Sequence, residues 1–180
     1  NTVATPYLIR PLEHGADIVV HSLTKFIGGH GTSIGGAIVD GGTFDYGDAN
    51  RFPNFNEPDP SYHGLSYWPA LGNGAYILKA RVQLLRDIGM AISTFNAFML
   101  LQGLETLSLR MERHCENARF VVDVLEDHPA VDRVLYPMLP DHPGHYAASK
   151  QMRDYGGMVS FTCTGGEAAA LELVTRTEVF

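Results

Sequence analysis

The hydrophobic pattern predicts two neighbouring strands near the start of the chain. Apolar, β-branched residues fill positions 18–20, so we expect Ala16–His21 to form a strand buried on both faces of an α/β sheet. The next apolar run, Ile34–Asp40, predicts a second short strand that closes at two glycines.

Two helices are predicted to follow. Gly74–Asp87 carries apolar residues on one helical face, so we expect an amphipathic helix that covers the sheet; the face consists of Ile77, Ala80, Leu84 and Ile88. Ser93 is expected to cap a second, largely apolar helix over Phe95–Gln102, and Gly103 is expected to end or bend it.

A third, longer helix is predicted to run to about Asp127, before His128 and Pro129 stop it. Apolar residues recur along it at spacings of three or four: Leu107, Met111, Cys115, Ala118, Val122 and Leu125. We interpret its charged residues as a solvated or subunit-facing surface: Arg110, Glu112, Arg113, His114 and Glu116. Strands at 131–136 and 158–163, with helices at 146–153 and 167–175, predict a further α/β unit.

Residues 43–71 form a long segment rich in Asp, Asn, Gly, Pro and aromatic residues. Loops of this length inside a compact domain tend to be functional or mobile. Its rings either build a stacking platform for a base or pin the segment to the domain surface or to a neighbouring subunit, and we favour the second interpretation. The rings are Phe44, Tyr46, Phe52, Phe55, Tyr62 and Tyr67.

Lys25 is the residue with the most distinctive chemical setting. It follows the end of the first predicted strand, where the loops of open α/β sheets converge on ligands. Ser22 and Thr24 alternate, so in an extended segment both hydroxyls would face one way and could donate to one phosphate. Gly28–Gly31 contains three glycines, which let backbone approach a ligand closely.

These features predict that Lys25 forms an imine with pyridoxal phosphate. The amine must first lose its proton, which burial or a neighbouring cation promotes by lowering the lysine pKa. The alternative is a solvated loop lysine followed by plain glycine turns. Lys79 and Lys150 have ordinary helical and polar surroundings, and no lysine follows the glycines as a P-loop requires.

Composition narrows the classes of partner. The chain has 180 residues, 45% of them hydrophobic, and a net charge of −7, which fits a globular protein and argues against a nucleic-acid surface. Two distant cysteines predict neither a disulfide framework nor a metal site, and they favour a reducing cytoplasm. We expect both to be core residues and expect turn positions for His142 and His145. No membrane-spanning run or leader is evident.

Three separated stretches carry a resemblance to a known family. Asn1–Tyr7, Pro11–Asp17 and His21–Gly31 resemble the Cys/Met metabolism family of pyridoxal-phosphate-dependent enzymes, and the likeness continues through Leu104–His114 to the end of the chain. It implies the later part of a fold type I (aspartate-aminotransferase-like) large domain plus part of a small C-terminal α/β domain. Residues 1–107, with an insertion at 43–71, would belong to the first, and 108–180 to the second.

The resemblance also implies an activity. Lys25 would be the catalytic residue and, with Ser22 and Thr24, would bind the cofactor, with no metal. The insertion resembles that of members which replace the acetate of O-acetylhomoserine with sulfide or a thiol, giving homocysteine or a thioether. Alternatives are a cystathionine γ-synthase or γ-lyase and a non-catalytic piece that acts only in self-association.

The resemblance further implies that the chain is the middle-to-late piece of a longer enzyme. The family's aspartate for the pyridine nitrogen would precede Asn1, and its carboxylate-binding arginine would follow Phe180. Expected partners are small-molecule substrates and copies of the enzyme, as a cytoplasmic homotetramer, with no nucleic acid or membrane.

Overall fold

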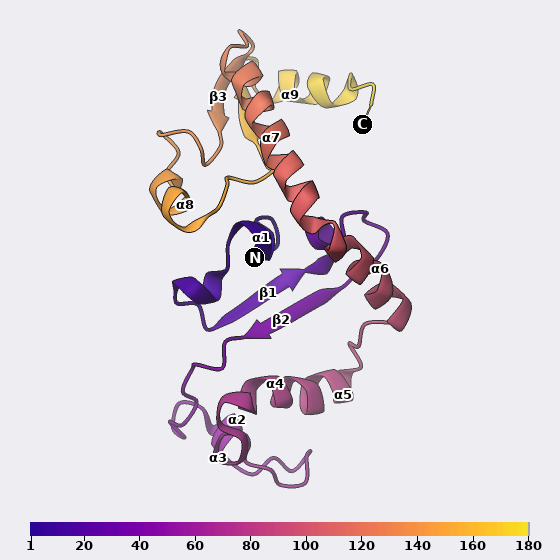
Figure 1. Ribbon diagram of the computed structural model, residues 1–180, viewed down its shortest axis with the longest axis vertical. Helices are drawn as coiled ribbons and strands as arrows, with labels where there is room; N and C mark the ends of the chain where they lie inside the picture. Colours follow the sequence, from indigo (N-terminus) through magenta and orange to yellow (C-terminus); the bar gives the residue numbers. More distant parts are fainter. Residues whose placement is uncertain (180) are drawn as a thin grey trace. The chain divides into compact units, whose positions relative to one another are not determined.

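The computed structural model describes residues 1–179 (Figure 1), and their contacts form two compact units. The first unit consists of residues 1–2 and 11–103, and the second of residues 3–10 and the chain from Leu104 onward. The division of the enzyme into domain portions 1–107 and 108–180 stays a prediction.

The first unit contains the two predicted strands as a hairpin. β1 (Ile18–Ser22) pairs antiparallel with β2 (Gly36–Asp40) in a register that places Ser22 opposite Gly36. Val19 is buried, but Val20 is 59% exposed. The expectation of burial on both faces is therefore wrong within residues 1–179, because the described sheet has two strands and β1 buries alternate side chains.

The predicted helix at 74–87 is confirmed, as three successive helical segments. The three segments are α4 (Ala75–Lys79), η4 (Ala80–Leu85) and α5 (Arg86–Ile88). Three short helices lie between β2 and α4: α2 (Pro53–Asn56), α3 (Tyr67–Leu71) and η3 (Gly72–Gly74). Another short helix, η1 (Pro11–His14), precedes β1. η4 is a turn of π-helix. The predicted apolar face is not fully covered, since Leu84 and Ile88 are 51% and 63% exposed.

Aromatic packing orders the segment 43–71. The Tyr46 ring stacks on Phe55 with centroids 4.3 Å apart and on Tyr76 of α4 at 6.1 Å. Phe44 and Phe52 lie against the same ring at 4.7 and 5.3 Å. The interpretation that these rings pin the segment to its own domain is confirmed, because Tyr76 lies outside it.

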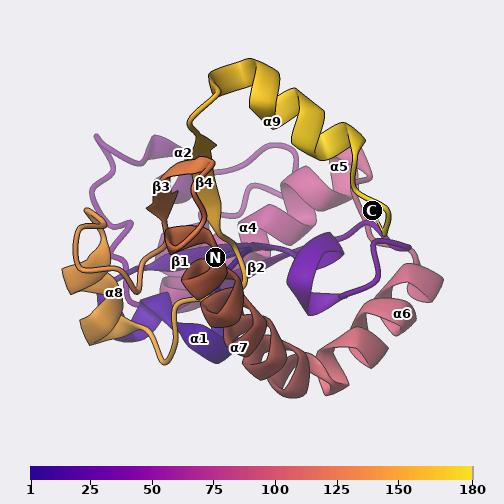
Figure 2. The same cartoon turned by 90° about the horizontal axis from the view of Figure 1, so that it is seen from above.

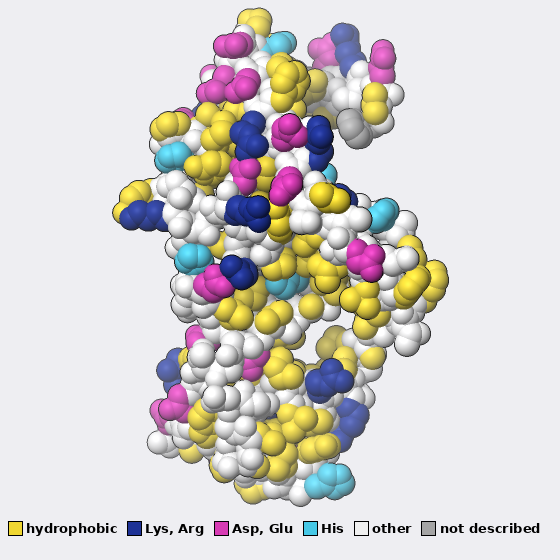
Figure 3. Space-filling model, in the orientation of Figure 1, with side chains coloured by type: hydrophobic (Ala, Val, Ile, Leu, Met, Phe, Trp, Pro, Cys, Tyr) yellow, Lys and Arg dark blue, Asp and Glu magenta, His cyan; other side chains and the backbone are white. Residues whose placement is uncertain are grey.

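α6 (Thr94–Glu105) confirms the second predicted helix and corrects its end. The Asn96 backbone N–H donates to Ser93 Oγ at 3.1 Å, so Ser93 caps the helix as predicted. The helix does not end at Gly103 but continues to Glu105. Figure 3 shows hydrophobic side chains gathered over α6. On this helix Phe95, Phe98 and Leu101 are 69%, 55% and 62% exposed.

The second unit is built on α7 (Leu107–Glu126), the third predicted helix. It continues through β3 (Val131–Leu135), α8 (His145–Gln151), β4 (Ser160–Cys163) and α9 (Gly166–Thr175), all close to their predicted ranges. β3 pairs antiparallel with β4 and lies beside α7 (Figure 2). Five of the six predicted apolar residues of α7 are buried: Leu107, Met111, Cys115, Ala118 and Val122. Cys163 is only half-buried, so its expected core position is wrong.

Residues 3–10 join this unit through α1 (Thr5–Leu8). Thr5 is fully buried and has a φ of 60°, a left-handed conformation that is rare for a β-branched residue. The Tyr7 hydroxyl donates to a carboxylate oxygen of Glu112 in α7, and the Arg153 backbone N–H donates to the Leu8 carbonyl at 2.8 Å. α1 is therefore fastened to both α7 and the turn after α8.

His142 lies in the turn predicted for it, whereas His145 begins α8, so its predicted turn position is wrong. The Gly144 backbone N–H donates to His142 Nδ1 at 3.0 Å, and His145 Nδ1 lies 2.9 Å from the Pro137 carbonyl oxygen. Within residues 1–179, no three His, Cys, Asp or Glu side chains gather as a metal site would require, and no helix has the length and apolarity to cross a membrane.

Candidate active site

Lys25 lies in the connection between β1 and β2. The Leu23 backbone N–H donates to the Gly35 carbonyl at 2.9 Å, which holds the two ends of this connection together. Inside it, η2 (Leu23–Ile27) coils as a π-helical turn that Lys25 interrupts, with φ −87° and ψ −122°. The expectation of an extended segment carrying two same-facing hydroxyls is wrong, because the backbone coils directly after Ser22.

Thr24 fastens this turn to the start of β2. Its Oγ1 accepts a hydrogen bond from the Gly35 backbone N–H at 3.1 Å and lies 3.4 Å from the Gly35 carbonyl oxygen. The Gly35 N–H therefore fixes the position of the Thr24 hydroxyl oxygen. The hydroxyl proton has only the longer contact, that with the Gly35 carbonyl oxygen. Such a hydroxyl retains the capacity to donate to a ligand.

The first two residues of the chain lie alongside β1. The amino group of Asn1 donates to the Val20 carbonyl at 2.8 Å, and the buried His21 ring places Nδ1 2.8 Å from the Asn1 carbonyl oxygen. The Ser22 backbone N–H donates to Thr2 Oγ1 at 3.0 Å. These contacts fix the end of β1, from which Lys25 follows.

The Lys25 side chain is exposed. The expectation that residues of this chain bury its amine is wrong for residues 1–179. Lys79 is the less exposed lysine: its side chain is 14% exposed, and its Nζ lies 3.8 Å from an Asp59 carboxylate oxygen. Lys79 was expected to be an ordinary helical lysine. The helical pattern around it did not indicate the ion pair, because the Asp59 carboxylate comes from the segment 43–71.

A small cavity of about 10 Å³ lies beside the Lys25 turn, roughly the space of one water molecule. Thr24 lines it, together with Gly28, His30 and Gly31 of the predicted glycine-rich stretch. Four further residues line it that the sequence did not single out as site residues: Thr32, Ser33, Met99 and Leu100. Ser33 is 7% exposed. Leu100 belongs to α6, so this helix contributes directly to the surroundings of the turn.

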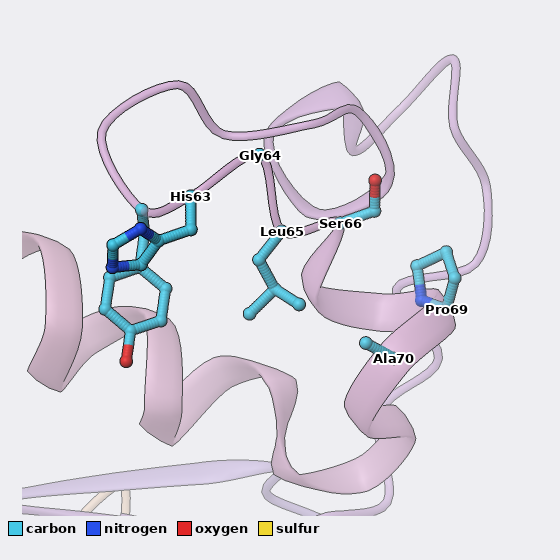
Figure 4. Close-up of a pocket in the computed structure, with 7 residues that line it drawn as sticks. His63, Gly64, Leu65, Ser66, Pro69 and Ala70 are labelled. Carbon is cyan, nitrogen blue, oxygen red and sulfur yellow. The ribbon is translucent and has the colours of Figure 1, made fainter.

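A larger, open cavity of about 530 Å³ lies in the segment 43–71 and contains none of Ser22, Thr24 and Lys25. Figure 4 shows Leu65, Pro69 and Ala70 around it, with the His63 ring at one side. His63 has a φ of 55°. The lining offers no amine and no carboxylate.

Comparison with known proteins identifies relatives over the whole chain. The model of a family described as Cys/Met metabolism PLP-dependent enzymes matches residues 1–180. An O-acetyl-L-homoserine sulfhydrylase of Leptospira meyeri is 53% identical over 100% of the chain, and a homocysteine synthase of Schizosaccharomyces pombe is 52% identical over 96%. The chain spans 43% and 41% of the lengths of these two relatives.

A solved structure extends the likeness to three dimensions. A proposed O-acetylhomoserine (thiol)-lyase of Campylobacter jejuni matches 100% of the chain with a TM-score of 0.92 and 38% identity, and the chain covers 45% of it. That crystal structure contains N'-pyridoxyl-lysine-5'-monophosphate. The match confirms the predicted α/β fold class and shows that this chain has part of the complete fold.

Proposed function

Since the chain belongs to the Cys/Met metabolism family of pyridoxal-phosphate-dependent enzymes, we propose that Lys25 is the residue to which the cofactor attaches. We propose further that Ser22 and Thr24 bind its phosphate. The observation that carries this assignment is the place of Lys25: an exposed amine in the connection after β1, on a turn that Thr24 fastens to Gly35.

The residues present fit such a cofactor. Lys25 supplies a primary amine that a ligand can reach, and Thr24 supplies a hydroxyl whose oxygen is already oriented by the Gly35 N–H. No heavy atom lies within 4 Å of the position that a Cβ on Gly31 would take, so the glycine-rich part of the loop leaves room beside it. Hydroxyl donors bind a dianionic phosphate through charge-assisted hydrogen bonds.

The proposed reaction of the whole enzyme is γ-replacement. O-acetylhomoserine and hydrogen sulfide give homocysteine and acetic acid, or a thiol gives the corresponding thioether. Bound pyridoxal phosphate supplies an electron sink for a carbanion on the amino-acid substrate. Lys25 Nζ accepts the proton from the substrate α-carbon and returns protons where they are needed, while Ser22 and Thr24 keep the cofactor in register.

The relatives support this substrate class, since their names include O-acetyl-L-homoserine sulfhydrylase and homocysteine synthase. Residues 1–107 belong to the large domain of the longer enzyme and residues 108–180 to its small domain, and the enzyme is a homotetramer. A cytoplasmic location is also proposed, and the free thiols of Cys115 and Cys163 suit a reducing compartment.

The test uses the longer enzyme that contains this chain. After addition of pyridoxal phosphate and reduction with borohydride, peptide mapping should find the cofactor on Lys25. Lys25→Ala should abolish this label and the activity, whereas Lys150→Ala, which changes an exposed lysine, should leave both unchanged. Label confined to other lysines would contradict the assignment.

Substrate choice is tested separately. The enzyme should form homocysteine from O-acetylhomoserine and sulfide faster than it makes or cleaves cystathionine. The reverse preference would identify a cystathionine γ-synthase or γ-lyase. A longer enzyme that binds no cofactor and turns over neither substrate would identify the chain as part of a self-associating, non-catalytic protein.

A further inference from the structure

We propose that Gly103 and Leu100 of α6 are positioning residues for Lys25: they hold the Gly28 peptide, and through it the turn that carries the reactive amine. This inference rests on the proposed function, because it assigns a task to residues that surround the proposed cofactor lysine. It also gives a reason for the glycine in the interior of α6, where glycine costs helix stability relative to alanine.

Gly103 brings the α6 backbone into direct contact with Gly28. A Cβ built on Gly103 would lie 2.2 Å from the Gly28 carbonyl oxygen and 2.8 Å from its Cα. Both atoms belong to the backbone, so an alanine here must displace either α6 or the Gly28 peptide. Residue 103 is therefore a glycine because two pieces of backbone touch at this point.

Leu100 fills the space one turn earlier on α6. It is 4% exposed. A Cβ on Gly28 would lie 2.6 Å from its Cδ2, and a Cβ on Gly35 would lie 2.6 Å from its Cδ1. One leucine side chain is thus inserted against two glycines, one on each side of the Lys25 connection, and it fixes the space between them.

The Gly28 peptide is connected to Lys25 by short hydrogen bonds. The Gly28 N–H donates to the Leu23 carbonyl at 2.8 Å, and the Gly29 N–H donates to the Lys25 carbonyl at 2.7 Å. His30 Nδ1 lies 2.7 Å from the Gly28 carbonyl oxygen and adds a third restraint. A shift of Gly28 therefore moves the backbone of Lys25 directly.

Placement of this amine has catalytic consequences. Lys25 Nζ must reach the cofactor and then the proton on the substrate α-carbon, and misplacing a reacting group by about 1 Å can lower a rate by about 100-fold. Because the Lys25 side chain is exposed in this chain, packing around its own Nζ does not orient it. The restraint on its backbone comes from α6 and from the Thr24 bond to Gly35.

The test compares three variants of the longer enzyme. Gly103→Ala adds the clashing methyl group and Leu100→Ala removes the inserted side chain. Gln102→Ala is the matched control, because Gln102 adjoins Gly103 on the same helix and is an exposed polar residue. Each purified variant is compared with the parent enzyme by thermal unfolding, by cofactor absorbance from pH 6 to 10, and by steady-state kinetics.

For Gly103→Ala and Leu100→Ala, the folded enzyme should lose about 10- to 100-fold in kcat with little change in KM. The pH midpoint of the cofactor absorbance change should also shift, because the proton affinity of the linked amine depends on its placement. Gln102→Ala should match the parent in kcat, KM, the pH midpoint and the unfolding temperature. A purely structural role would lower the unfolding temperature of the two variants without moving this midpoint.

An unchanged midpoint and kcat in folded Gly103→Ala and Leu100→Ala would overturn the inference. If Gly103→Ala does not fold, Leu100→Ala decides. Failure of the proposed function itself is a separate outcome, because it would appear in the parent enzyme as the absence of cofactor on Lys25. Cofactor on Lys25 in the parent, combined with parent-like behaviour in both variants, would reject the positioning role alone.

Discussion

Asp59 shows how single residues order the segment 43–71. Its carboxylate is 7% exposed and accepts hydrogen bonds from the Tyr67 and Ser61 hydroxyls, both at 2.7 Å. These bonds, led by that from Tyr67, lower the pKa of Asp59 to about 2, and nearby Lys79 adds to the effect. Burial, together with the Asp59 carboxylate, raises the pKa of Tyr67 to about 12. The pair thus favours ionised Asp59 with neutral Tyr67.

This pair predicts a specific dependence of stability on pH. The folded pKa of Asp59 lies below its ordinary value of 3.8, so its contribution is present above about pH 4 and is lost as pH falls toward about 2. Asp59→Asn should therefore be less stable than the parent at pH 6, and the difference should shrink at pH 3. Urea unfolding at both values measures it. A difference that stays constant with pH would contradict the prediction.

Thr24 predicts a second residue-scale effect. Thr24→Val keeps the shape of the side chain but leaves the Gly35 N–H without its acceptor, so we expect a loss of about 1 kcal/mol in the free energy of unfolding. Cofactor affinity should fall as well, because the proposed phosphate donor is removed. Thr24→Ser keeps the hydroxyl and should restore most of both. Titration with pyridoxal phosphate and urea unfolding measure the two effects; equal behaviour of valine and serine would disprove the role.

At the residue scale, the sequence predicted where Lys25 lies but not how its surroundings are arranged. The apolar run before it fixed the strand, and the position after the strand followed directly. The partner of Thr24 could not be predicted, because the Gly35 N–H becomes available only when β1 and β2 pair. The exposure of Lys25 depends on tertiary packing, which spacing along the chain does not report.

At the element scale, periodicity predicted α7 well and α6 less well. Residues at spacings of three or four identify a buried face when one side of a helix meets the core, as with Met111 and Cys115, which are both fully buried. Gly103 was misread as a helix end because its purpose is a close contact with Gly28. That contact joins positions far apart in the sequence, so only the fold reveals it.

The buried face of α7 predicts a large effect of a single truncation. Met111→Ala should lower the free energy of unfolding by about 2–5 kcal/mol, because it opens a cavity at a side chain with no exposed surface. Asn117→Ala, on the same helix at an exposed polar position, should stay within about 0.5 kcal/mol of the parent. Urea unfolding of both variants tests the assignment of the face, and similar losses would show that it is wrong.

At the scale of the whole molecule, the exposed hydrophobic side chains are the prominent feature. Phe95, Phe98 and Leu101 on α6 are each more than half exposed, and so are Leu109 and Phe120 on α7. Exposed apolar side chains gathered on a helix are typical of interfaces. The chain spans less than half the length of its relatives, and we propose that the remainder of the enzyme covers each of these two helix faces.

This surface predicts different behaviour of the 180-residue chain and the longer enzyme. Purified alone, the chain should bind a hydrophobic dye and grow in apparent mass with concentration, despite its charge of −7. The longer enzyme should scatter light as a single species of several subunits and bind less dye. If the chain stays monomeric and binds no dye at any concentration, these faces need no partner.

The membership of α1 in the second unit bears on the order in which the protein can be assembled during synthesis. Residues 3–10 are synthesised well before the residues that they contact, because Tyr7 must wait for Glu112, 105 positions later, and the Leu8 carbonyl must wait for Arg153. Contacts so distant in sequence close late and slow folding. Residues 3–10 therefore stay undocked until the second unit has been synthesised as far as Arg153.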